Sequence, residues 1–222
     1  MSLEAAEAEV RERFSEASMV INHLRTIAPA DHQPVDDLQK TLRGLCLVSI
    51  YAAFERSANA IIEAALVELT SHETPSTSYI TSLHGLMHYA KVKSLRACGF
   101  DHILDRPKVL FDAAFEDSSG SFLENPLAER MQNVDGGTLE WLASLFGVSD
   151  HACAPANRGR LGNLRERRNA VAHGREAAGF VGGRFSMDEL SNVYNAADME
   201  VTRFLIAIRN QCDRRLYIRR AA

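Results

Sequence analysis

The apolar residues of this chain are spaced for helices almost from one end to the other. They recur every three or four positions and therefore fall on one stripe of an α-helix. Five segments share this spacing: residues 3–27, 36–70, 137–147, 160–173 and 186–217. No segment shows the strict alternation of apolar and polar residues that is typical of a half-buried strand. The pattern therefore predicts an all-α fold.

Residues that cap or stop helices mark several of the expected ends. The segment 186–189, Ser-Met-Asp-Glu, has the form of a capping box and predicts a helix start at its serine. Thr138 is the expected N-cap of the helix over 137–147, and Gly174 is expected to end the helix that precedes it. The glycine-rich segment after Gly174 predicts a sharp turn, and the Pro-containing segment 28–34 predicts a loop.

Residues 72–135 have the least regular pattern of the chain. Within them, residues 78–97 and 107–115 have helical spacing, and the stretch between these two pieces is interpreted as a loop. Residues 116–126 have the polar, Gly- and Pro-containing composition of a mobile surface loop. We interpret the region as a helical and loop insertion between core helices. The 222 residues then form one domain, 1–222, with about four core helices.

Charge is distributed unevenly along the chain. The net charge is -4, but residues 158–222 contain 13 arginines, no lysine and seven acids and so carry +6, while residues 1–157 carry -10. An acidic chain is a poor candidate for bulk nucleic-acid binding. A local surplus of arginine nevertheless permits a phosphate-binding surface in the last third, since the planar guanidinium fork matches phosphate oxygens. The alternative is that many of these arginines lie on solvated helix faces.

The motifs of common nucleotide- and metal-dependent enzymes are absent from the sequence. There is no Walker loop, no G-x-G-x-x-G after a strand, no H-E-x-x-H and no G-x-S-x-G. His84 and His88 are four residues apart, but with no acid between them they are interpreted as a partly exposed helix face rather than a metal site. The sequence therefore implies neither a metal nor a cofactor.

Cysteine usage and the first residues bear on the cellular compartment. Cys46, Cys98, Cys153 and Cys212 are scattered without a C-x-x-C pair, which is typical of reduced thiols. The charged first residues predict no secretory signal, and the longest uncharged apolar runs are shorter than the roughly 20 residues of a membrane span. We expect a cytoplasmic protein with no membrane contact.

The segment 165–174, Arg-Glu-Arg-Arg-Asn-Ala-Val-Ala-His-Gly, is the most unusual part of the sequence. On a helix, Arg168 interrupts an apolar stripe made by Leu161, Leu164 and Val171. A guanidinium on such a stripe must find an anion or another acceptor, because burying it unpaired is costly. That anion is either a carboxylate of the bundle or a phosphate of a ligand.

A second polar stripe lies beside the first one. Arg165, Asn169 and His173 follow one another at intervals of four residues. Arg168 and His173 are separated by about 140° around the helix axis, so they converge poorly within one chain. Across a two-fold axis, two copies of the helix would face each other and build a joint pocket.

The long helix predicted over 36–70 has a matching anomaly. Glu55 falls within the stripe of Leu47, Tyr51, Ala58 and Ile62. A carboxylate there requires a cation, and Arg168 is the attractive candidate. The pair is either architectural or a device that orients the arginine for phosphate binding, and the spacing alone favours the architectural role.

These residues together resemble a known family. The segment 168–173, read as R-N-x-x-x-H at the start of a helix, resembles the signature of HEPN domains (higher eukaryotes and prokaryotes nucleotide-binding). The segment 51–55, Tyr-Ala-Ala-Phe-Glu, is similar to the aromatic-Glu motif of a prokaryotic subgroup, the MAE-type HEPN-like nucleases. The resemblance covers roughly residues 35–70 and 130–210, and it implies a HEPN-like helical bundle.

The resemblance also implies a chemistry, that of a metal-independent endoribonuclease active as a homodimer. Arg168 would contact the scissile phosphate, His173 would act as general acid or base, and Asn169 would support the turn or the phosphate. Glu55 would orient Arg168. The 2′-hydroxyl of the RNA would be the nucleophile and a cyclic phosphate the product, with a nearby helix N-terminus adding positive potential.

Two arginines flank this motif, and they carry the remaining expectations. Arg165 and Arg175 are expected to bind the RNA substrate. Arg175 stands where toxins paired with nucleotidyltransferase antitoxins usually carry a tyrosine, so that mode of regulation is not expected. The leading interpretation is a toxin or defence effector with an antitoxin or defence-system partner protein. The alternatives are a non-catalytic HEPN module that binds RNA, nucleotide or a partner protein, and a plain interaction bundle in which Glu55 and Arg168 form a structural pair.

Overall fold

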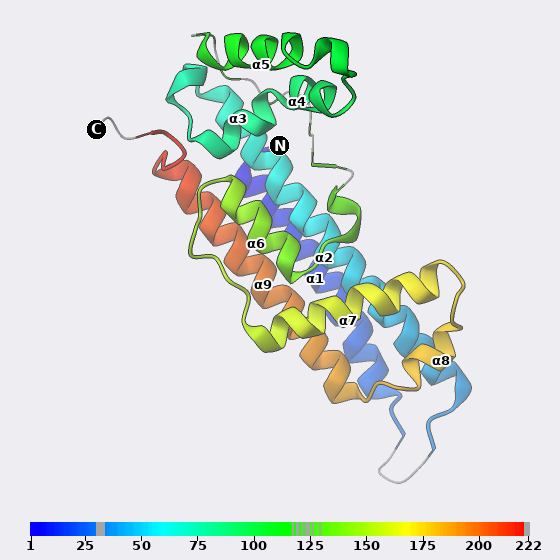
Figure 1. The fold of residues 1–222 in the computed structure, drawn as a ribbon. Helices are drawn as coiled ribbons and strands as arrows, with labels where there is room; N and C mark the ends of the chain where they lie inside the picture. The colour runs from blue at the N-terminus through cyan, green and yellow to red at the C-terminus, as the bar shows by residue number, and fades with distance from the viewer. Residues whose placement is uncertain are drawn as a thin grey trace.

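The computed structural model describes residues 1–29, 34–116 and 130–219, together with residues 118, 120, 122, 125, 127 and 128. Over these residues the protein is a bundle of helices (Figure 1). The α-helices are α1 (Leu3–Thr26), α2 (Asp37–Ser71), α3 (Thr81–Met87), α4 (Tyr89–Arg96), α5 (Asp105–Phe115), α6 (Gly136–Leu145), α7 (Pro155–Ala172), α8 (Ala178–Gly182) and α9 (Met187–Asp213). The short 3-10 helices are η1 (Ser76–Ser78), η2 (Phe100–His102) and η3 (Arg130–Asn133). The predicted all-α fold is confirmed.

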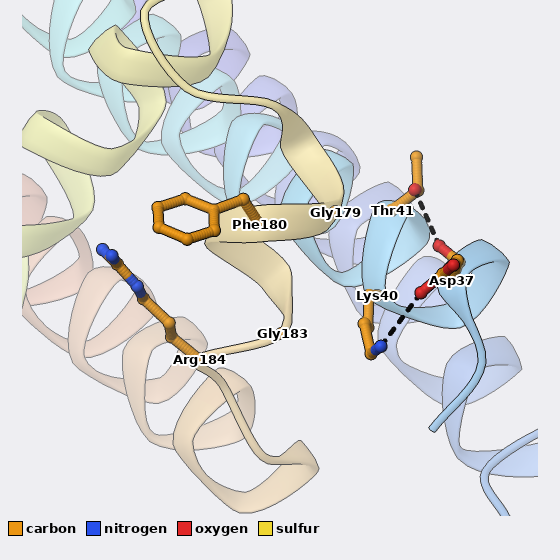
Figure 2. Close-up of a pocket in the computed structure, with 7 residues that line it drawn as sticks. All are labelled: Asp37, Lys40, Thr41, Gly179, Phe180, Gly183 and Arg184. Carbon is orange, nitrogen blue, oxygen red and sulfur yellow. Dashed lines mark hydrogen bonds and ion pairs between the residues drawn. The ribbon is translucent and has the colours of Figure 1, made fainter. Parts of the chain in front are cut away.

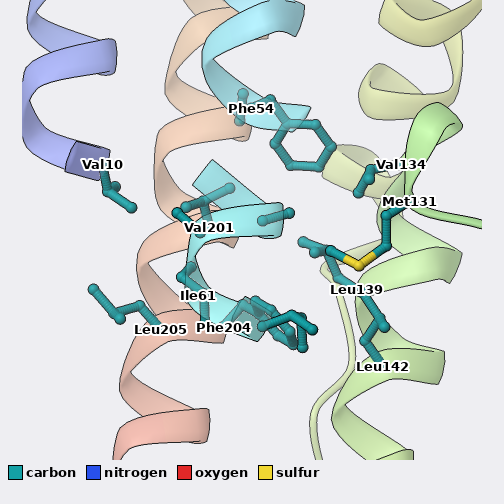
Figure 3. Packing of buried hydrophobic residues seen from close by; sticks show 14 of the residues in the cluster. Val10, Phe54, Ile61, Met131, Val134, Leu139, Leu142, Val201, Phe204 and Leu205 are labelled. Carbon is teal, nitrogen blue, oxygen red and sulfur yellow. The ribbon is translucent and has the colours of Figure 1, made fainter. Parts of the chain in front are cut away.

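The three longest helices, α1, α2 and α9, pack against one another along the bundle (Figure 1). Their buried side chains form one cluster, in which Phe54 and Ile61 of α2 lie with Phe204 of α9 and Val10 of α1 (Figure 3). On the other side of α2, the cluster takes in Leu139 of α6 (Figure 3). Each such side chain contributes roughly 1.5–3 kcal/mol when it is fully removed from water.

Helix α2 is apolar on almost every side because the other helices surround it. By length and composition alone it is the one described helix that could cross a membrane, with a mean hydropathy of 1.3 over an 18-residue window. Of that window, 61% is buried inside the protein, which is typical of a core helix. Among residues 1–29, 34–116 and 130–219, no other helix passes the same test.

Helix α7 crosses the bundle obliquely and contacts both α2 and α9 (Figure 1). Only Leu161 and Leu164 of this helix are buried, and its remaining residues are partly or fully exposed. The helix therefore lies on the core with a narrow apolar stripe and presents most of its arginines and asparagines outward.

Helix α8 lies against α2 with unusually close backbones. A Cβ placed on Gly182 would collide with the carbonyl oxygen of Lys40, and one placed on Gly44 would collide with that of Ala178. Glycine at both positions is what permits this approach. The segment after Gly174 thus contains a short helix where we expected only a turn, because its apolar and small residues pack on α2.

Several helix ends differ from the sequence-based expectation. Thr138 is not the N-cap of α6. Asp135 takes that position, and its Oδ1 accepts hydrogen bonds from the Thr138 backbone N at 2.9 Å and Oγ1 at 3.0 Å.

Helix α7 begins at Pro155, five residues earlier than expected, because proline suits the first turn of a helix. Helix α9 ends at Asp213, and the chain then turns so that Tyr217 is buried. The capping box at Ser186 is confirmed.

Most of the insertion expected over residues 72–135 lies at one end of the bundle, where α3, α4 and α5 are grouped (Figure 1). Its last part, with η3 and Asp135, lies instead beside α2 and α7. The predicted helical piece 78–97 divides into α3 and α4, and part of the loop expected before residue 107 is helical, as η2 and the first turn of α5. The predicted loops 28–34 and 116–126 both contain residues outside the described part. The assignment of residues 1–222 to a single domain stays a prediction.

Candidate functional site

The centre of the site is an ion pair between α7 and α2. Arg168 donates from Nη2 to Oε2 of Glu55 at 2.5 Å, and the two residues are 113 positions apart in the sequence. Their side chains are 18% and 22% exposed, so the pair is half-buried rather than sealed in the core. The contact expected from two charges on apolar stripes is therefore present, and it remains accessible from solvent.

Two further groups hold the Arg168 guanidinium. Its Nη1 donates to Oδ1 of Asn169 at 2.8 Å, and its Cζ lies 4.1 Å from the centre of the Tyr51 ring. Tyr51 is fully buried, and its hydroxyl donates to the carbonyl oxygen of Val134 at 3.1 Å. A guanidinium stacked on a buried ring and hydrogen-bonded in its plane is fixed in orientation.

Burial also changes the acid–base character of the two partners on α2. Desolvation raises the pKa of the Glu55 carboxyl above its usual value, against the opposing effect of the Arg168 guanidinium and of the Tyr51 hydroxyl. Burial, and secondarily the nearby Glu55 carboxylate, raises the pKa of the Tyr51 phenol. Tyr51 therefore stays protonated at neutral pH and acts as a hydrogen-bond donor and a stacking surface.

The segment that contains η3 closes the site from a third direction. Asn133 accepts at Oδ1 a hydrogen bond of 3.0 Å from Nδ2 of Asn169. Asn59 of α2 anchors the same segment, since its Nδ2 donates to the carbonyl oxygen of Met131 at 3.3 Å and to that of Glu55 at 2.8 Å. Sequence reasoning missed Asn133 because it lies in the irregular region before α6, where no periodic pattern points to it.

Arg165 lies next to this network and has a partner of its own. It donates from Nη1 to Oδ2 of Asp135, the residue that caps α6. Asp135 thus joins the N-terminus of α6 to α7. The sequence pattern did not identify Asp135. The Arg165 side chain is 32% exposed, so it is tied to the bundle while part of it faces solvent.

His173 occupies the opposite end of α7 from the one that the resemblance suggested. It is the C-cap residue, so the R-N-x-x-x-H segment lies at the end of the helix and not at its start. The carbonyl end of a helix carries partial negative charge, so α7 itself does not supply the positive potential that we expected from a helix N-terminus. The His173 side chain is exposed and has no hydrogen-bond or ion-pair partner within the described ranges of the chain.

The turn after His173 has the form of a Schellman motif. Gly174 has φ +66, the backbone N of Arg175 donates to the carbonyl oxygen of Ala170 at 2.8 Å, and that of Gly174 donates to Val171 at 3.0 Å. Glycine is favoured at the left-handed position because it has no Cβ. The Arg175 side chain projects from this turn and is exposed. The structure thus joins Glu55, Arg168 and Asn169 in one network, with His173 and Arg175 at the helix end outside it.

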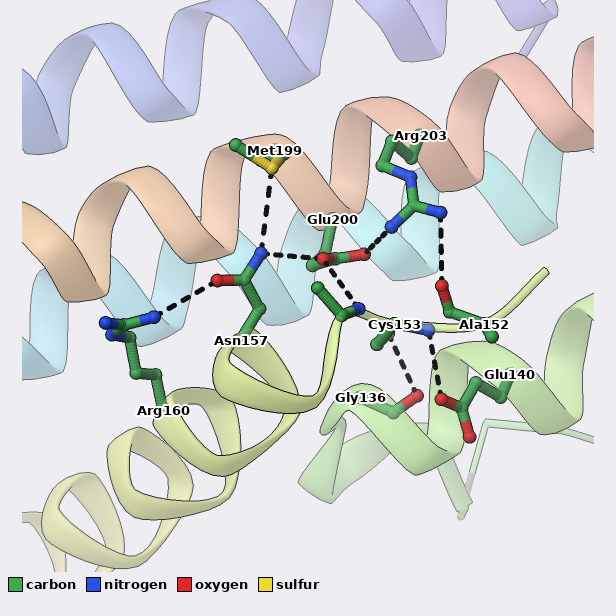
Figure 4. Close-up of polar contacts among 10 residues, drawn as sticks. Gly136, Glu140, Ala152, Cys153, Asn157, Arg160, Met199, Glu200 and Arg203 are labelled. Atoms are coloured by element: carbon green, nitrogen blue, oxygen red, sulfur yellow. Dashed lines mark hydrogen bonds and ion pairs between the residues drawn. The ribbon is translucent and has the colours of Figure 1, made fainter.

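A buried carboxylate fixes the start of the same helix (Figure 4). Glu200 of α9 is fully buried and accepts at Oε1 from the backbone N of Ala154 at 3.3 Å and from Nδ2 of Asn157 at 2.7 Å. Arg203 donates to its other oxygen at 2.9 Å. A negative charge at a helix N-terminus is stabilised by the free amide groups there. In the sequence, Glu200 could have been recognised because it is a glutamate on the apolar stripe of α9.

The histidines, cysteines and acids of the described residues do not form a metal site. Over the residues that the structure describes, no three His, Cys, Asp or Glu side chains come together as metal ligands. The rings of His84 and His88 lie side by side, with centroids 5.9 Å apart. All four cysteines are free, and burial raises the pKa of the Cys46, Cys153 and Cys212 thiols to about 12.

Comparisons with known proteins bear on this arrangement. No curated protein and no solved structure matches the chain significantly. The model of one family, described as RiboL-PSP-HEPN, matches residues 8–212, from the first helix to the end of α9. This match includes both Glu55 and the R-N-x-x-x-H segment. The helical bundle, the motif and the extent of the match agree, and the chain belongs to the RiboL-PSP-HEPN family of HEPN domains.

Proposed function

We propose that the protein is a metal-independent endoribonuclease of the HEPN type, acting as a toxin or defence effector on RNA. Membership of a HEPN family supports a nuclease-like or RNA-related function. The observation that carries the proposal is the state of Arg168. Glu55, Asn169 and Tyr51 hold its guanidinium in place, yet 18% of the side chain is exposed and accessible to a phosphate.

In the proposed reaction, His173 takes the proton of the RNA 2′-hydroxyl. The 2′-oxygen then attacks the adjacent phosphorus, the bond to the 5′-oxygen breaks, and a cyclic 2′,3′-phosphate remains. The leaving 5′-oxygen receives a proton, which an imidazole can also supply at neutral pH. Arg168 stabilises the additional negative charge on the phosphate oxygens, a role that a fixed guanidinium performs without a metal.

The proposed active unit is a homodimer. Arg168 and His173 lie about 140° apart around the axis of α7, so one helix does not direct both toward one phosphate. Two copies related by a two-fold axis supply an arginine and a histidine to each shared phosphate. Arg175, exposed in the turn beside His173, is the proposed additional contact to the RNA, and an antitoxin or defence-system protein is the proposed partner.

The test is cleavage of a labelled RNA pool in EDTA by the wild type and by His173→Ala. Removal of the general acid–base group should lower the rate about 100- to 10,000-fold. Folding should be unaffected, because the His173 side chain is exposed and has no partner within the described residues. His23→Ala, which removes another exposed histidine, is the matched control and should cleave like the wild type. Retained cleavage by His173→Ala would reject the assignment.

One observation favours a non-catalytic alternative. The Arg168 guanidinium already donates to Glu55 and Asn169 within its own subunit, so a purely structural role of the pair needs no ligand. A HEPN module that only binds RNA, nucleotide or a partner protein would bind RNA without releasing cyclic phosphate. An RNA-binding measurement beside the cleavage assay separates the two functions.

A further inference from the structure

A second polar hollow lies on the flank of α7 away from Glu55. It encloses about 430 Å³ between α7, the segment after α8 and the first turns of α9. Its walls carry basic, amide and acidic side chains, among them Arg160, Asn163, Arg167, Arg184, Glu189 and Asn192. None of these residues takes part in the Arg168 network.

The arginines of this hollow are only loosely paired. Arg167 and Arg184 share one carboxylate, that of Glu176, at 3.7 Å and 3.9 Å, which exceeds hydrogen-bond length. Arg160 donates only one long hydrogen bond, of 3.4 Å to Asn157. Their guanidinium groups therefore keep free N–H donors directed at solvent or at a ligand.

One oxygen of the carboxylate that lines the hollow is hydrogen-bonded to the N-cap of its own helix. Glu189 is part of the capping box of α9, where its Oε2 accepts from the backbone N of Ser186 at 2.7 Å and from its hydroxyl at 2.9 Å. The amide side chains of Asn163 and Asn192 have no partner in the described part of the chain. The hollow is thus rich in unused donors.

An exposed aromatic ring stands at the edge of the same surface. Phe180 of α8 is 56% exposed, and Cζ of Arg184 lies 4.1 Å from the centre of its ring (Figure 2). Arg184 also lines a second hollow of about 530 Å³, where Lys40 and Thr41 of α2 lie opposite α8 (Figure 2). Arg184 therefore lines both hollows, and Phe180 lines the second one, where the Lys40 ammonium is paired with Asp37 at 2.9 Å.

We propose that this surface, made by Arg160, Arg167, Arg184 and Phe180 and here called the α7–α8 groove, binds a single-stranded RNA segment away from the cleaved bond. Guanidinium forks contact successive phosphates, and an unpaired base stacks on the face of the exposed Phe180 ring opposite Arg184. Only an unpaired base has a free face for such stacking, which is why the strand is single. The inference rests on the proposed function, since it assigns a second contact surface to the same RNA substrate.

The groove is within reach of the motif end of α7. Arg167 and His173 are six residues apart, which is about 9 Å along the helix axis and about 120° around it. Arg160 lies about 20 Å from His173 along the same axis. A strand of a few nucleotides that passes around the end of α7 contacts His173 first and the groove next.

The experiment measures RNA binding by fluorescence anisotropy, with every protein carrying His173→Ala so that no RNA is cut. The probes are a labelled 12-nucleotide and a labelled 3-nucleotide oligoribonucleotide. Phe180→Ala should raise Kd for the longer strand about 5- to 100-fold, and Arg184→Gln should raise it about tenfold and flatten its salt dependence. Kd for the 3-nucleotide strand should change less than twofold. Arg106→Gln, which removes an exposed arginine of α5, is the control for lost charge.

Three outcomes would overturn the assignment of the α7–α8 groove. One is an unchanged Kd for the longer strand in both groove variants, and another is an equal loss in the Arg106→Gln control. The third is binding of a free mononucleotide as tight as that of the strand and lost in the groove variants, since it would make the groove a nucleotide site. Because binding is measured without cleavage, a wild type that fails to cut RNA rejects the proposed function while leaving the groove test intact.

Discussion

At the scale of single residues, the environment of Arg168 decides what the site can do. The guanidinium is fixed by Glu55, Asn169 and the Tyr51 ring, and the carboxylate it faces has been partly removed from water. The ion pair holds the Arg168 side chain in one orientation. Without it, the long side chain would sample many rotamers. The His173 side chain, by contrast, is exposed and has no hydrogen-bond or ion-pair partner among the described residues.

Removing Arg168 tests whether the pair has a purely architectural role. Arg168→Ala should lower the free energy of unfolding by about 1–3 kcal/mol, because the half-buried Glu55 carboxylate loses its cation. The double variant Arg168→Ala/Glu55→Gln should recover part of this loss, as followed by thermal denaturation. If Arg168 also contacts RNA, the double variant stays inactive in the cleavage assay. Recovery of both stability and cleavage would assign Arg168 to architecture alone.

The raised pKa of Glu55 predicts how stability depends on pH. The folded state holds the Glu55 proton more tightly than the unfolded chain, so the wild type loses stability as pH rises from the ordinary value of 4.5 through the raised folded value. Glu55→Gln does not titrate and escapes this loss. Melting temperatures measured from about pH 4 to pH 7 should therefore favour Glu55→Gln increasingly over the wild type. A difference that stays constant or shrinks with pH would contradict the burial of this carboxyl.

At the scale of elements, contacts outside its own apolar stripe fix both ends of α7. Glu200 of α9 holds its first turn, and the left-handed Gly174 ends it directly after His173. The ion pair of Arg165 with Asp135 joins its middle to the cap of α6. These contacts determine where the exposed histidine stands relative to the arginine network, since Leu161 and Leu164 alone leave the helix free to shift along its axis.

A substitution at Gly174 tests the helix end. Gly174→Ala forces a Cβ into the left-handed region and should cost about 1 kcal/mol of stability, while displacing His173 and lowering the cleavage rate. Gly162→Ala is the matched control: it lies inside α7 with open space at its Cβ, so it should stabilise the protein by up to about 1 kcal/mol. Thermal denaturation and RNA cleavage measure the two effects. Equal behaviour of the two variants would show that the turn has no special role.

At the scale of the whole molecule, the chain divides its polar side chains between two faces of α7. The Glu55–Arg168 network faces α2 and η3, whereas the α7–α8 groove lies on the flank toward α8 and α9. Helix α7 lies obliquely across the bundle (Figure 1), and its residues other than Leu161 and Leu164 are partly or fully exposed. This placement is compatible with a second copy that packs on the motif end of the helix while RNA follows its length.

Mixing two inactive variants tests the proposed dimer. Arg168→Ala and His173→Ala homodimers should each be inactive, but in a mixed dimer the arginine of one chain and the histidine of the other form one complete site. Co-expression with two different tags and purification of the mixed species should restore up to about half of the wild-type activity. A mixed dimer without activity, or a wild type that is monomeric by light scattering at assay concentration, would reject a shared site.

Much of the fold and part of the site could be predicted from the sequence. The helix spans follow from local spacing, so α1, α2 and the capping box of α9 lie where the pattern placed them. Glu55 and Arg168 could be paired across 113 residues because each charge interrupts an apolar stripe and each needs a counter-ion. Asn133 and Asp135 could not be found in this way, since they lie in irregular segments where no period distinguishes a functional residue from a loop residue.

The sequence by itself determined the all-α fold, the main helices and the identity of the charged pair, because helix periodicity and the cost of an unpaired charge are local properties of the chain. The tertiary structure alone decided that α8 packs on α2 and that Asn133 and Asp135 lie beside Asn169 and Arg165 of α7. Each of these depends on contacts between residues far apart in the sequence, such as the backbone approach at Gly44 and Gly182. The spacing of residues within one segment does not predict those contacts, because they form only when distant segments pack together.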